Sequence, residues 1–190
     1  MNSSTIPFRI KLGVTGHRVL KDQDSIVRRI REVLNSKIYD LFDIDVTKEK
    51  GKSSIAFTIL SPLAEGADRL VACEVLKFPD STIEVVLPFT KEEYLKDFET
   101  EESKREFEEL YRKAREVIVL NDHHLKEVSS TINPAEARKK AYEIVGHHVV
   151  NHCDVLIALW DGRPSRGRGG TAEIVAYARE KKCPMLIISP

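Results

Sequence analysis

The chain of 190 residues contains 30 basic and 30 acidic residues, so its formal net charge is zero at pH 7. This balance does not favour a surface that binds nucleic acid or a membrane by electrostatics, although it leaves room for a local basic patch. With 42% hydrophobic residues the chain can bury one sizeable core. We therefore expect a single domain over residues 1–190.

Targeting segments and cysteines bound the location of the protein. Residues 1–7 are polar and too short for a signal peptide, and no apolar run approaches the roughly 20 residues of a membrane span. Cys73, Cys153 and Cys183 each lie beside or within an apolar segment. Buried, reduced thiols in a cytoplasmic protein are the simplest explanation. The chain stops at Pro190 directly after a predicted strand, so we expect it to be a module of a longer protein.

Short apolar segments alternate with amphipathic ones along the chain. They predict six strands, at residues 9–14, 55–60, 83–87, 117–120, 155–160 and 185–188. Residues suited to a helix N-cap precede three of the intervening helices: Asp22 or Asp24, Thr90 with Glu93, and Asn133 with Pro134. The last of these helices continues to about His152, and a charge-rich helix with one apolar stripe occupies residues 101–115.

Two connecting segments are polar and irregular. Residues 36–54 read as a surface connection with a short helix at about Ile38 to Phe42. Residues 121–133 form a polar loop that is long enough to cover a site as a flap.

Alternation of strands and helices predicts the fold class. It is typical of an α/β, Rossmann-like, doubly wound and mostly parallel sheet of about six strands, with helices on both faces. In such sheets ligands bind outside the carboxyl ends of the strands, at a switch in strand order. Polar or glycine-containing turns follow four predicted strands, at residues 15–18, 61–68, 88–90 and 161–171. We expect these turns to line one crevice.

The turn after the strand at 155–160 shows the strongest sign of a ligand site. The residues that carry it are Asp161, Gly162, three further glycines (Gly167, Gly169, Gly170), Thr171 and three arginines (Arg163, Arg166, Arg168). The first N–H groups of a helix have no internal partner and lie at the positive end of its dipole. A phosphate suits that position. The alternative is a glycine-rich turn that only lets the helix pack closely.

Other candidate residues lie on the remaining turns. Gly16, His17 and Arg18 form a glycine turn after the first strand, which is as compatible with a bare turn as with a ligand contact. Ser61, Glu65, Asp68 and, on the last turn, Glu173 offer acceptors for ribose hydroxyls; as an alternative, the three acids are ordinary residues favoured at helix N-termini. Trp160 and Tyr94 are candidates to stack on a base, or else core or edge aromatics.

Three histidines precede Cys153, and two of them, His148 and His152, share a helix face. Their spacing matches no common zinc pattern, so we expect no metal site. We expect His148 to pack on the apolar helix face, and His147 or His152 to face solvent or a neighbouring subunit.

Four motifs resemble those of the bacterial SLOG-type domains of the Smf/DprA and LOG superfamily, over nearly the whole chain. They are GVTGHR at 13–18, SPLAEGADRLVA at 61–72, LPF at 87–89, and CDVLIALWDG with GRGGTAEIV at 153–175. The resemblance implies a Rossmann-like domain that binds a nucleotide-derived ligand. Dimers are usual among proteins of this type. Some members, in antiphage defence proteins and in the cytosolic part of certain ion channels, bind ADP-ribose or cyclic ADP-ribose signals without turning them over. The LOG phosphoribohydrolases cleave the N-glycosidic bond of nucleoside monophosphates.

The segment DGRPSRGRGGTAEIVAYA is also similar to nucleoside deoxyribosyltransferases, whose nucleophilic glutamate corresponds to Glu173. LOG enzymes carry PGGxGTxxE, whereas GRGGTAE lacks the leading proline and places its glutamate two residues after the threonine. The arginine-rich helix motif of LOG enzymes is not evident, with only Arg138, Lys139 and Lys140 nearby. These departures weigh against LOG-type hydrolysis and leave phosphate binding intact.

We therefore expect a sensor or regulatory domain that binds ADP-ribose, cyclic ADP-ribose or a cyclic nucleotide and needs no cofactor. We expect it to form a homodimer or higher homo-oligomer and to act through an effector domain or partner. The phosphates are expected on Gly169, Gly170 and Thr171 with Gly16 and Arg18, and the ribose on Glu65, Asp68 or Glu173. The alternative is an enzyme that cleaves or transfers an N-glycosidic bond, with Glu173 at the sugar carbon and Asp161 positioning the sugar. Single-stranded DNA binding, as in DprA, is a third reading, against which the neutral charge counts.

Overall fold

The computed structural model describes residues 8–44, 55–120, 133–164 and 170–190. Within them lies one all-parallel sheet in the order β4-β3-β2-β1-β5-β6. Its strands are β1 (Phe8–Gly16), β2 (Ile55–Ser61), β3 (Thr82–Leu87), β4 (Ala114–Val119), β5 (Val155–Leu159) and β6 (Met185–Ile188). The predicted α/β, Rossmann-like, doubly wound fold is confirmed.

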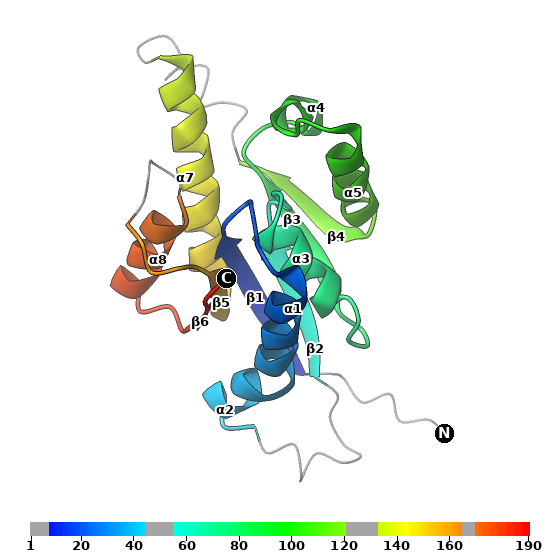
Figure 1. Ribbon diagram of the computed structural model, residues 1–190, viewed down its shortest axis with the longest axis vertical. Coiled ribbons are helices and arrows are strands. Elements are labelled where there is room, and N and C mark those ends of the chain that lie inside the picture. The colour runs from blue at the N-terminus through cyan, green and yellow to red at the C-terminus, as the bar shows by residue number, and fades with distance from the viewer. Residues whose placement is uncertain (1–7, 45–54, 121–132, 165–169) are drawn as a thin grey trace.

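Helices cover both faces of this sheet. In the described ranges they are α1 (Gln23–Glu32), a π-helical turn η1 (Val33–Lys37), α2 (Ile38–Leu41), α3 (Ala67–Val75), α4 (Lys91–Tyr94), a 3-10 turn η2 (Leu95–Asp97), α5 (Glu101–Tyr111), α7 (Pro134–His152) and α8 (Thr171–Glu180). Figure 1 shows α7 beside α8, and α1 beside α3 across the sheet from them. The short helix expected near Ile38 is present as α2.

Alternation along the strands divides the core into two layers. Leu12 and Ile157 point to the layer that α1, α3 and α5 cover. Leu60 and Leu156 point to the layer that α7 and α8 cover, where Val149 and Ile174 meet them. Because both faces are covered, the central strands are apolar on nearly every residue. Burial of each such side chain contributes about 1.5–3 kcal/mol.

The capping residues expected from the sequence are present. Asp22, rather than Asp24, caps α1 by accepting a hydrogen bond from the Ser25 N–H. Thr90 accepts from the Glu93 N–H at 3.4 Å and caps α4. Asn133 accepts from the Ala135 N–H, and Pro134 is the first residue of α7. Side-chain caps satisfy donors that have no partner within the helix.

Two expectations were wrong. The fourth strand begins at Ala114, inside the segment predicted as helix, because α5 ends at Tyr111. β4 is an edge strand, which tolerates the charged residues Arg115 and Glu116 that make this segment look like part of the helix in the sequence.

The second wrong expectation is that all three cysteines are buried. Cys73 of α3 is exposed, whereas Cys153 and Cys183 are half-buried. The flap expected at 121–133 lies, apart from Asn133, outside the described residues.

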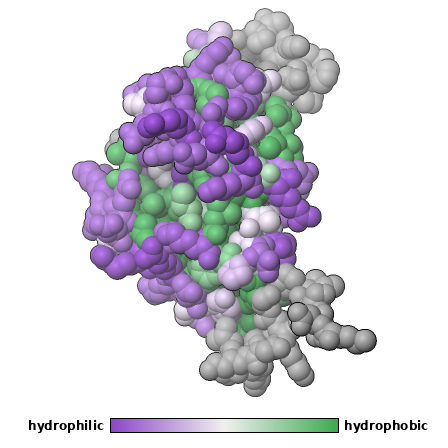
Figure 2. Space-filling model, turned by 90° about the vertical axis from the view of Figure 1, so that its right-hand side faces the viewer, coloured by the Kyte–Doolittle hydropathy of each residue, from purple (hydrophilic) through white to green (hydrophobic). Residues whose placement is uncertain are grey.

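The edge at β4 leaves some apolar surface exposed. Figure 2 views the side of the molecule that carries α5 and β4, and it shows apolar residues between polar ones. Val117 and Val119, on the same face of β4, are 39% and 41% exposed. None of the helices in the described part of the chain is long and apolar enough to cross a membrane.

The strand order positions the site. From β1 the chain proceeds through β2, β3 and β4 toward one edge of the sheet, and it returns to β5 and β6 on the other side of β1. The switch therefore lies between β1 and β5, whose carboxyl ends are in register at the pair Gly16 and Leu159. Ligands of doubly wound sheets bind outside the strand ends at such a switch.

Candidate functional site

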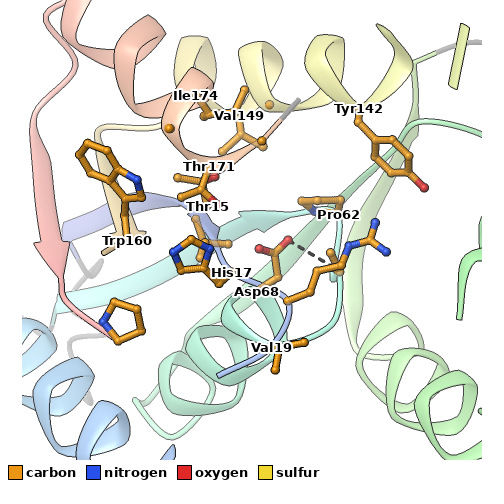
Figure 3. Close-up of a pocket in the computed structure, with 18 of the residues that line it drawn as sticks. Thr15, His17, Val19, Pro62, Asp68, Tyr142, Val149, Trp160, Thr171 and Ile174 are labelled. Atoms are coloured by element: carbon orange, nitrogen blue, oxygen red, sulfur yellow. Dashed lines mark hydrogen bonds between the residues drawn. The ribbon is translucent and has the colours of Figure 1, made fainter. Parts of the chain in front are cut away.

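A cavity of about 990 Å³ lies at this switch point. Its walls come from the turn after β1, the loop before α3, the turn after β5, the first turn of α8 and one face of α7. Figure 3 shows Trp160 and Tyr142 at opposite sides of the cavity, with His17 and Asp68 between them. Three of the four turns expected to line one crevice do so, those at 15–18, 61–68 and 161–171, whereas residues 88–90 are not part of the lining.

At the β5 side, Asp161 organises the turn. Its Oδ1 accepts a hydrogen bond from the Arg163 N–H at 3.0 Å, and the Arg163 carbonyl accepts from Trp160 Nε1 at 2.9 Å. The backbone N–H of Arg163, with the nearby His17, lowers the pKa of Asp161. The carboxylate therefore stays ionised at neutral pH.

His17 links the β1 turn to this side. Its Nε2 lies 3.3 Å from Asp161 Oδ1, close enough for an ion pair when the imidazole is protonated. The Nε2 atom is buried, however, and it has no partner with hydrogen-bond geometry among the described residues. The backbone of His17 is fixed on both sides, by an N–H to Leu159 O and a carbonyl that accepts from Ala67 N. The imidazole is thus held at the cavity beside the Asp161 carboxylate.

At the α3 side, a buried carboxylate faces the cavity. Asp68 is 5% exposed, and its Oδ2 accepts hydrogen bonds from Ser61 Oγ at 3.0 Å and Ala64 N at 3.3 Å. Burial raises the pKa of Asp68 to about 7, against the opposing effects of these two donors, Arg18 and Arg69. Ser61 also accepts from the Leu63 N–H, so it fixes the loop and the carboxylate together.

Two tyrosines complete this side. The Tyr94 side chain is fully buried, with its ring edge-on to Phe98 and Phe107, so the ring cannot stack on a base. Burial raises the pKa of Tyr94, and the nearby Asp68 adds to this. Arg18 lies over the ring of Tyr142, 5.7 Å from its centroid.

Both phenol hydroxyls are buried without a hydrogen-bond partner among the described residues. An unsatisfied buried polar group costs about 1–3 kcal/mol, and native proteins contain few. Here three of them, Tyr94 Oη, Tyr142 Oη and His17 Nε2, belong to residues that line one cavity. These three residues place polar groups in the cavity wall.

Glycines allow the close packing of the strand ends. A Cβ at Gly16 would lie 2.4 Å from Ala67 Cβ and 2.8 Å from Leu159 Cβ, so packing alone requires glycine there. Gly66 has φ +77°, and a Cβ would lie 2.2 Å from the carbonyl oxygen of Arg18. The α3 loop and the β1 turn therefore meet backbone to backbone.

The structure places the predicted site residues in three groups. Seven line the cavity: Gly16, His17, Arg18, Asp68, Asp161, Gly170 and Thr171. Four are not part of its lining: Ser61, Glu65, Gly162 and Glu173. Gly169, with Arg166, Gly167 and Arg168, lies outside the described residues.

Those outside the lining have other surroundings. Glu65 faces α5, where its Oε1 accepts a hydrogen bond from Ser103 Oγ. Gly162, with φ +80°, makes the turn in open space. Glu173 lies in the first turn of α8, where its N–H donates to Gly170 O at 3.0 Å, and its neighbours Ala172 and Ile174 do line the cavity.

The contribution of α7 was missed. Tyr142, Val145, Gly146 and Val149 line the cavity from this helix. A Cβ at Gly146 would lie 2.3 Å from Ile174 Cδ1, so the glycine brings α7 and α8 together. A glycine inside a helical pattern was the available signal, because it costs stability unless packing requires it.

Arg138 holds the start of α7 in place. Its guanidinium binds Glu93 Oε1 at 2.9 Å and Asp97 Oδ1 at 2.6 Å, and it lies 4.3 Å from the centroid of the Phe89 ring. This arginine is engaged with protein groups that follow β3, and it is absent from the cavity lining.

The histidines of α7 pair by stacking. The rings of His148 and His152 are 3.9 Å apart, and His147 stacks on Tyr177 of α8 at 3.7 Å. His148 and His152 share a helix face, as expected, and burial lowers the pKa of His148. Across the four described ranges, no group of three or more His, Cys, Asp or Glu side chains is placed to hold a metal ion.

Comparisons with known proteins found no match for this chain. The sequence matches no family model, and no curated protein matches it either.

Proposed function

We propose that the cavity binds a nucleotide-derived ligand of the ADP-ribose, cyclic ADP-ribose or cyclic nucleotide class, and that the domain acts as a sensor or regulatory module. The observation that carries the proposal is a cavity at the strand-order switch whose wall combines the first turn of α8 with Arg18 and the carboxylate of Asp68. The volume of about 990 Å³ lies at the upper end of the range typical of small-molecule pockets.

The anionic part of the ligand lies at the first turn of α8. Gly170 and Thr171 present the N-terminus of a ten-residue helix to the cavity. Phosphate oxygens accept hydrogen bonds from such N–H groups and gain from the helix dipole. His17 and Arg18 add a donor and a positive charge on the facing turn.

Asp68 accepts the ribose hydroxyls. Asp68, in the first turn of α3, lines the cavity, whereas Glu65 in the loop before α3 is hydrogen-bonded to Ser103. An ionised carboxylate accepts paired hydrogen bonds, and each is worth about 1.5–3 kcal/mol. The base lies against the apolar wall of Val145, Val149 and Ile174, with Trp160 at the rim as a stacking partner.

Sensing requires an output that this domain does not itself supply. We place the effector in a further domain or a partner, with the domain acting as a homo-oligomer in antiphage signalling. The resemblance to SLOG-type domains supports this part of the proposal.

The experiment is a thermal shift against ADP-ribose, cyclic ADP-ribose and cyclic nucleotides, followed by chromatography of the ligand. One ligand should raise the melting temperature and be recovered intact. Asp68→Asn should remove that rise, whereas Asp24→Asn, at an exposed acid of α1, should keep it. No rise with any of these ligands overturns the proposal.

The same chromatography tests the enzymatic alternative, an N-glycosidic hydrolase or transferase. Its support is the position of Glu173 between two residues that line the cavity. Nucleoside monophosphates, deoxynucleosides and NAD would then yield free base. Glu173→Gln would abolish the release, and the sensor proposal would give way to it.

A further inference from the structure

Two cysteines lie side by side at the opposite end of the sheet from the cavity. Cys153 is the C-cap of α7, directly before β5, and Cys183 lies in the turn between α8 and β6. Their Sγ atoms are 3.8 Å apart, although the residues are separated by 30 positions. Both cysteines are free, and both residues are half-buried.

The surroundings leave room for the sulfurs to approach. A disulfide has an S–S length of about 2.0 Å, so the two sulfurs must close a little less than 2 Å. Neither residue lies inside a helix or strand, which lets both adjust. Gly13 of β1 also makes space, because a Cβ there would lie 2.8 Å from Cys153 Sγ.

The two thiols differ in acidity. The hydrogen bond with Cys153 lowers the pKa of Cys183 to about 7, assisted by the backbone N–H of Leu156 and opposed by burial and by the nearby Asp154 carboxylate. The same hydrogen bond and burial raise the pKa of Cys153. A thiolate is the nucleophilic form of cysteine, so Cys183 is the attacking group and Cys153 the resolving one.

We propose that Cys153 and Cys183 form a redox-active pair that hydrogen peroxide converts into a disulfide. The Cys183 thiolate attacks one peroxide oxygen; the S–O bond forms, the O–O bond breaks, and hydroxide leaves and takes up a proton to become water. Cys153 then attacks the sulfenic sulfur; the S–S bond forms, the S–O bond breaks, and hydroxide leaves with the thiol proton as a second water. Two thiols and one peroxide thus give one disulfide and two waters.

The bond would join the end of α7 to the turn that follows α8. These two helices supply one wall of the cavity, through Tyr142 and Val149 on α7 and Thr171 and Ile174 on α8. Oxidation therefore links α7 to the turn after α8 at the end remote from the cavity, and neither cysteine lines the cavity. The pair does not depend on the ligand proposed above, and its test needs none.

The test treats the Cys73→Ser protein with hydrogen peroxide, because this variant removes the exposed thiol and keeps the pair. Thiol titration should fall from two thiols per chain to none, and the mass should fall by about 2 Da, as two hydrogens leave when the S–S bond forms. Closing a loop of this length should raise the melting temperature by about 10 °C, reversibly with dithiothreitol.

Single variants assign the roles. In Cys153→Ser the reaction should stop at a sulfenic acid on Cys183, which dimedone traps. In Cys183→Ser, Cys153 should remain a thiol under the same treatment. The proposal is overturned if the Cys73→Ser protein keeps both thiols, if Cys183 passes directly to sulfinic acid, or if the disulfide joins two chains.

Discussion

The loop that leads into α3 and the turn that leads toward α8 contain similar residue types, but they differ in burial and in the pKa of their aspartates. Each follows a buried strand and contains a glycine with positive φ, and each has an aspartate close by. In the first turn of α3, Asp68 is 5% exposed and its pKa is raised to about 7. After β5, the side chain of Asp161 is 32% exposed and its pKa is lowered.

The glycines show the same contrast. Gly66 is pressed against the backbone of the β1 turn, whereas Gly162 has nothing within 4 Å of a Cβ position. The α3 side is therefore a closely packed wall with a carboxylate that can be neutral or charged near pH 7. The β5 side is open and keeps its charge. The comparison teaches that a turn's sequence gives its residue types, but the packing around it decides their chemistry.

Replacing the buried carboxylate should give the largest effect. The folded-state pKa of Asp68 is raised about three units above its ordinary value, so the folded state holds its proton more tightly than the unfolded state does. Its contribution to stability is present at about pH 4 and is lost as the pH rises through about 7, a change of about 4 kcal/mol. Asp68→Asn lacks this loss, so urea unfolding should show its stability relative to wild type rising across that range. A constant difference between the two proteins would contradict the burial of a titrating carboxylate.

The two positive-φ glycines form a matched pair. Gly66→Ala combines backbone strain with a clash against the Arg18 carbonyl, and we expect a loss of about 3 kcal/mol in the free energy of unfolding. Gly162→Ala meets no neighbour and should lose only about 1 kcal/mol, from strain alone. Equal losses in chemical denaturation would remove the distinction between a packed and an open turn.

The α7 wall permits a smaller test. Gly146→Ala forces Ile174 to shift, and overpacking of about 2 kcal/mol is partly offset by the roughly 1 kcal/mol better helix propensity of alanine. The expected net loss is about 1 kcal/mol. Ile174→Val in the Gly146→Ala background should relieve the clash, which a double-mutant cycle would detect as favourable coupling. Additive losses would mean that the two helices are not in contact at this point.

Asp161→Asn should have the smallest effect on stability, and the opposite sign of pH dependence. Its folded-state pKa is lowered, so its contribution is present above the ordinary carboxyl pKa and is lost as the pH falls through the lowered value. Acid unfolding of the variant should therefore be less steep than that of wild type. If Asp161→Asn instead changed stability near pH 7, as Asp68→Asn does, the contrast between the two turns would fail.

The sequence was sufficient for most of the fold, because buried strands of a parallel sheet are continuous apolar runs and capping residues mark helix starts. It misplaced only the start of β4, three residues too late, because an edge position admits charges at Arg115 and Glu116. At the site, Glu65 and Asp68 look alike in the sequence, since both are acids near a helix start. Only the packing of α5, which brings Ser103 to Glu65, separates them.

The face of α7 could not be assigned to the cavity for a related reason. Helical periodicity identifies an apolar face, but it does not say which element covers that face. Tyr142 and Val149 belong to the same stripe that packs on the sheet, and the cavity lies where the stripe passes the strand ends.

The most direct test of ligand binding at the switch point is isothermal titration of ADP-ribose into the protein at about pH 8, where Asp68 is ionised according to its pKa of about 7. Saturable binding at one site per chain is predicted, weakened at least about tenfold by Asp68→Asn, because a charge-assisted hydrogen bond of 1.5 kcal/mol or more is lost. No saturable heat with ADP-ribose, cyclic ADP-ribose or cyclic nucleotides, or binding that Asp68→Asn leaves unchanged, would contradict it.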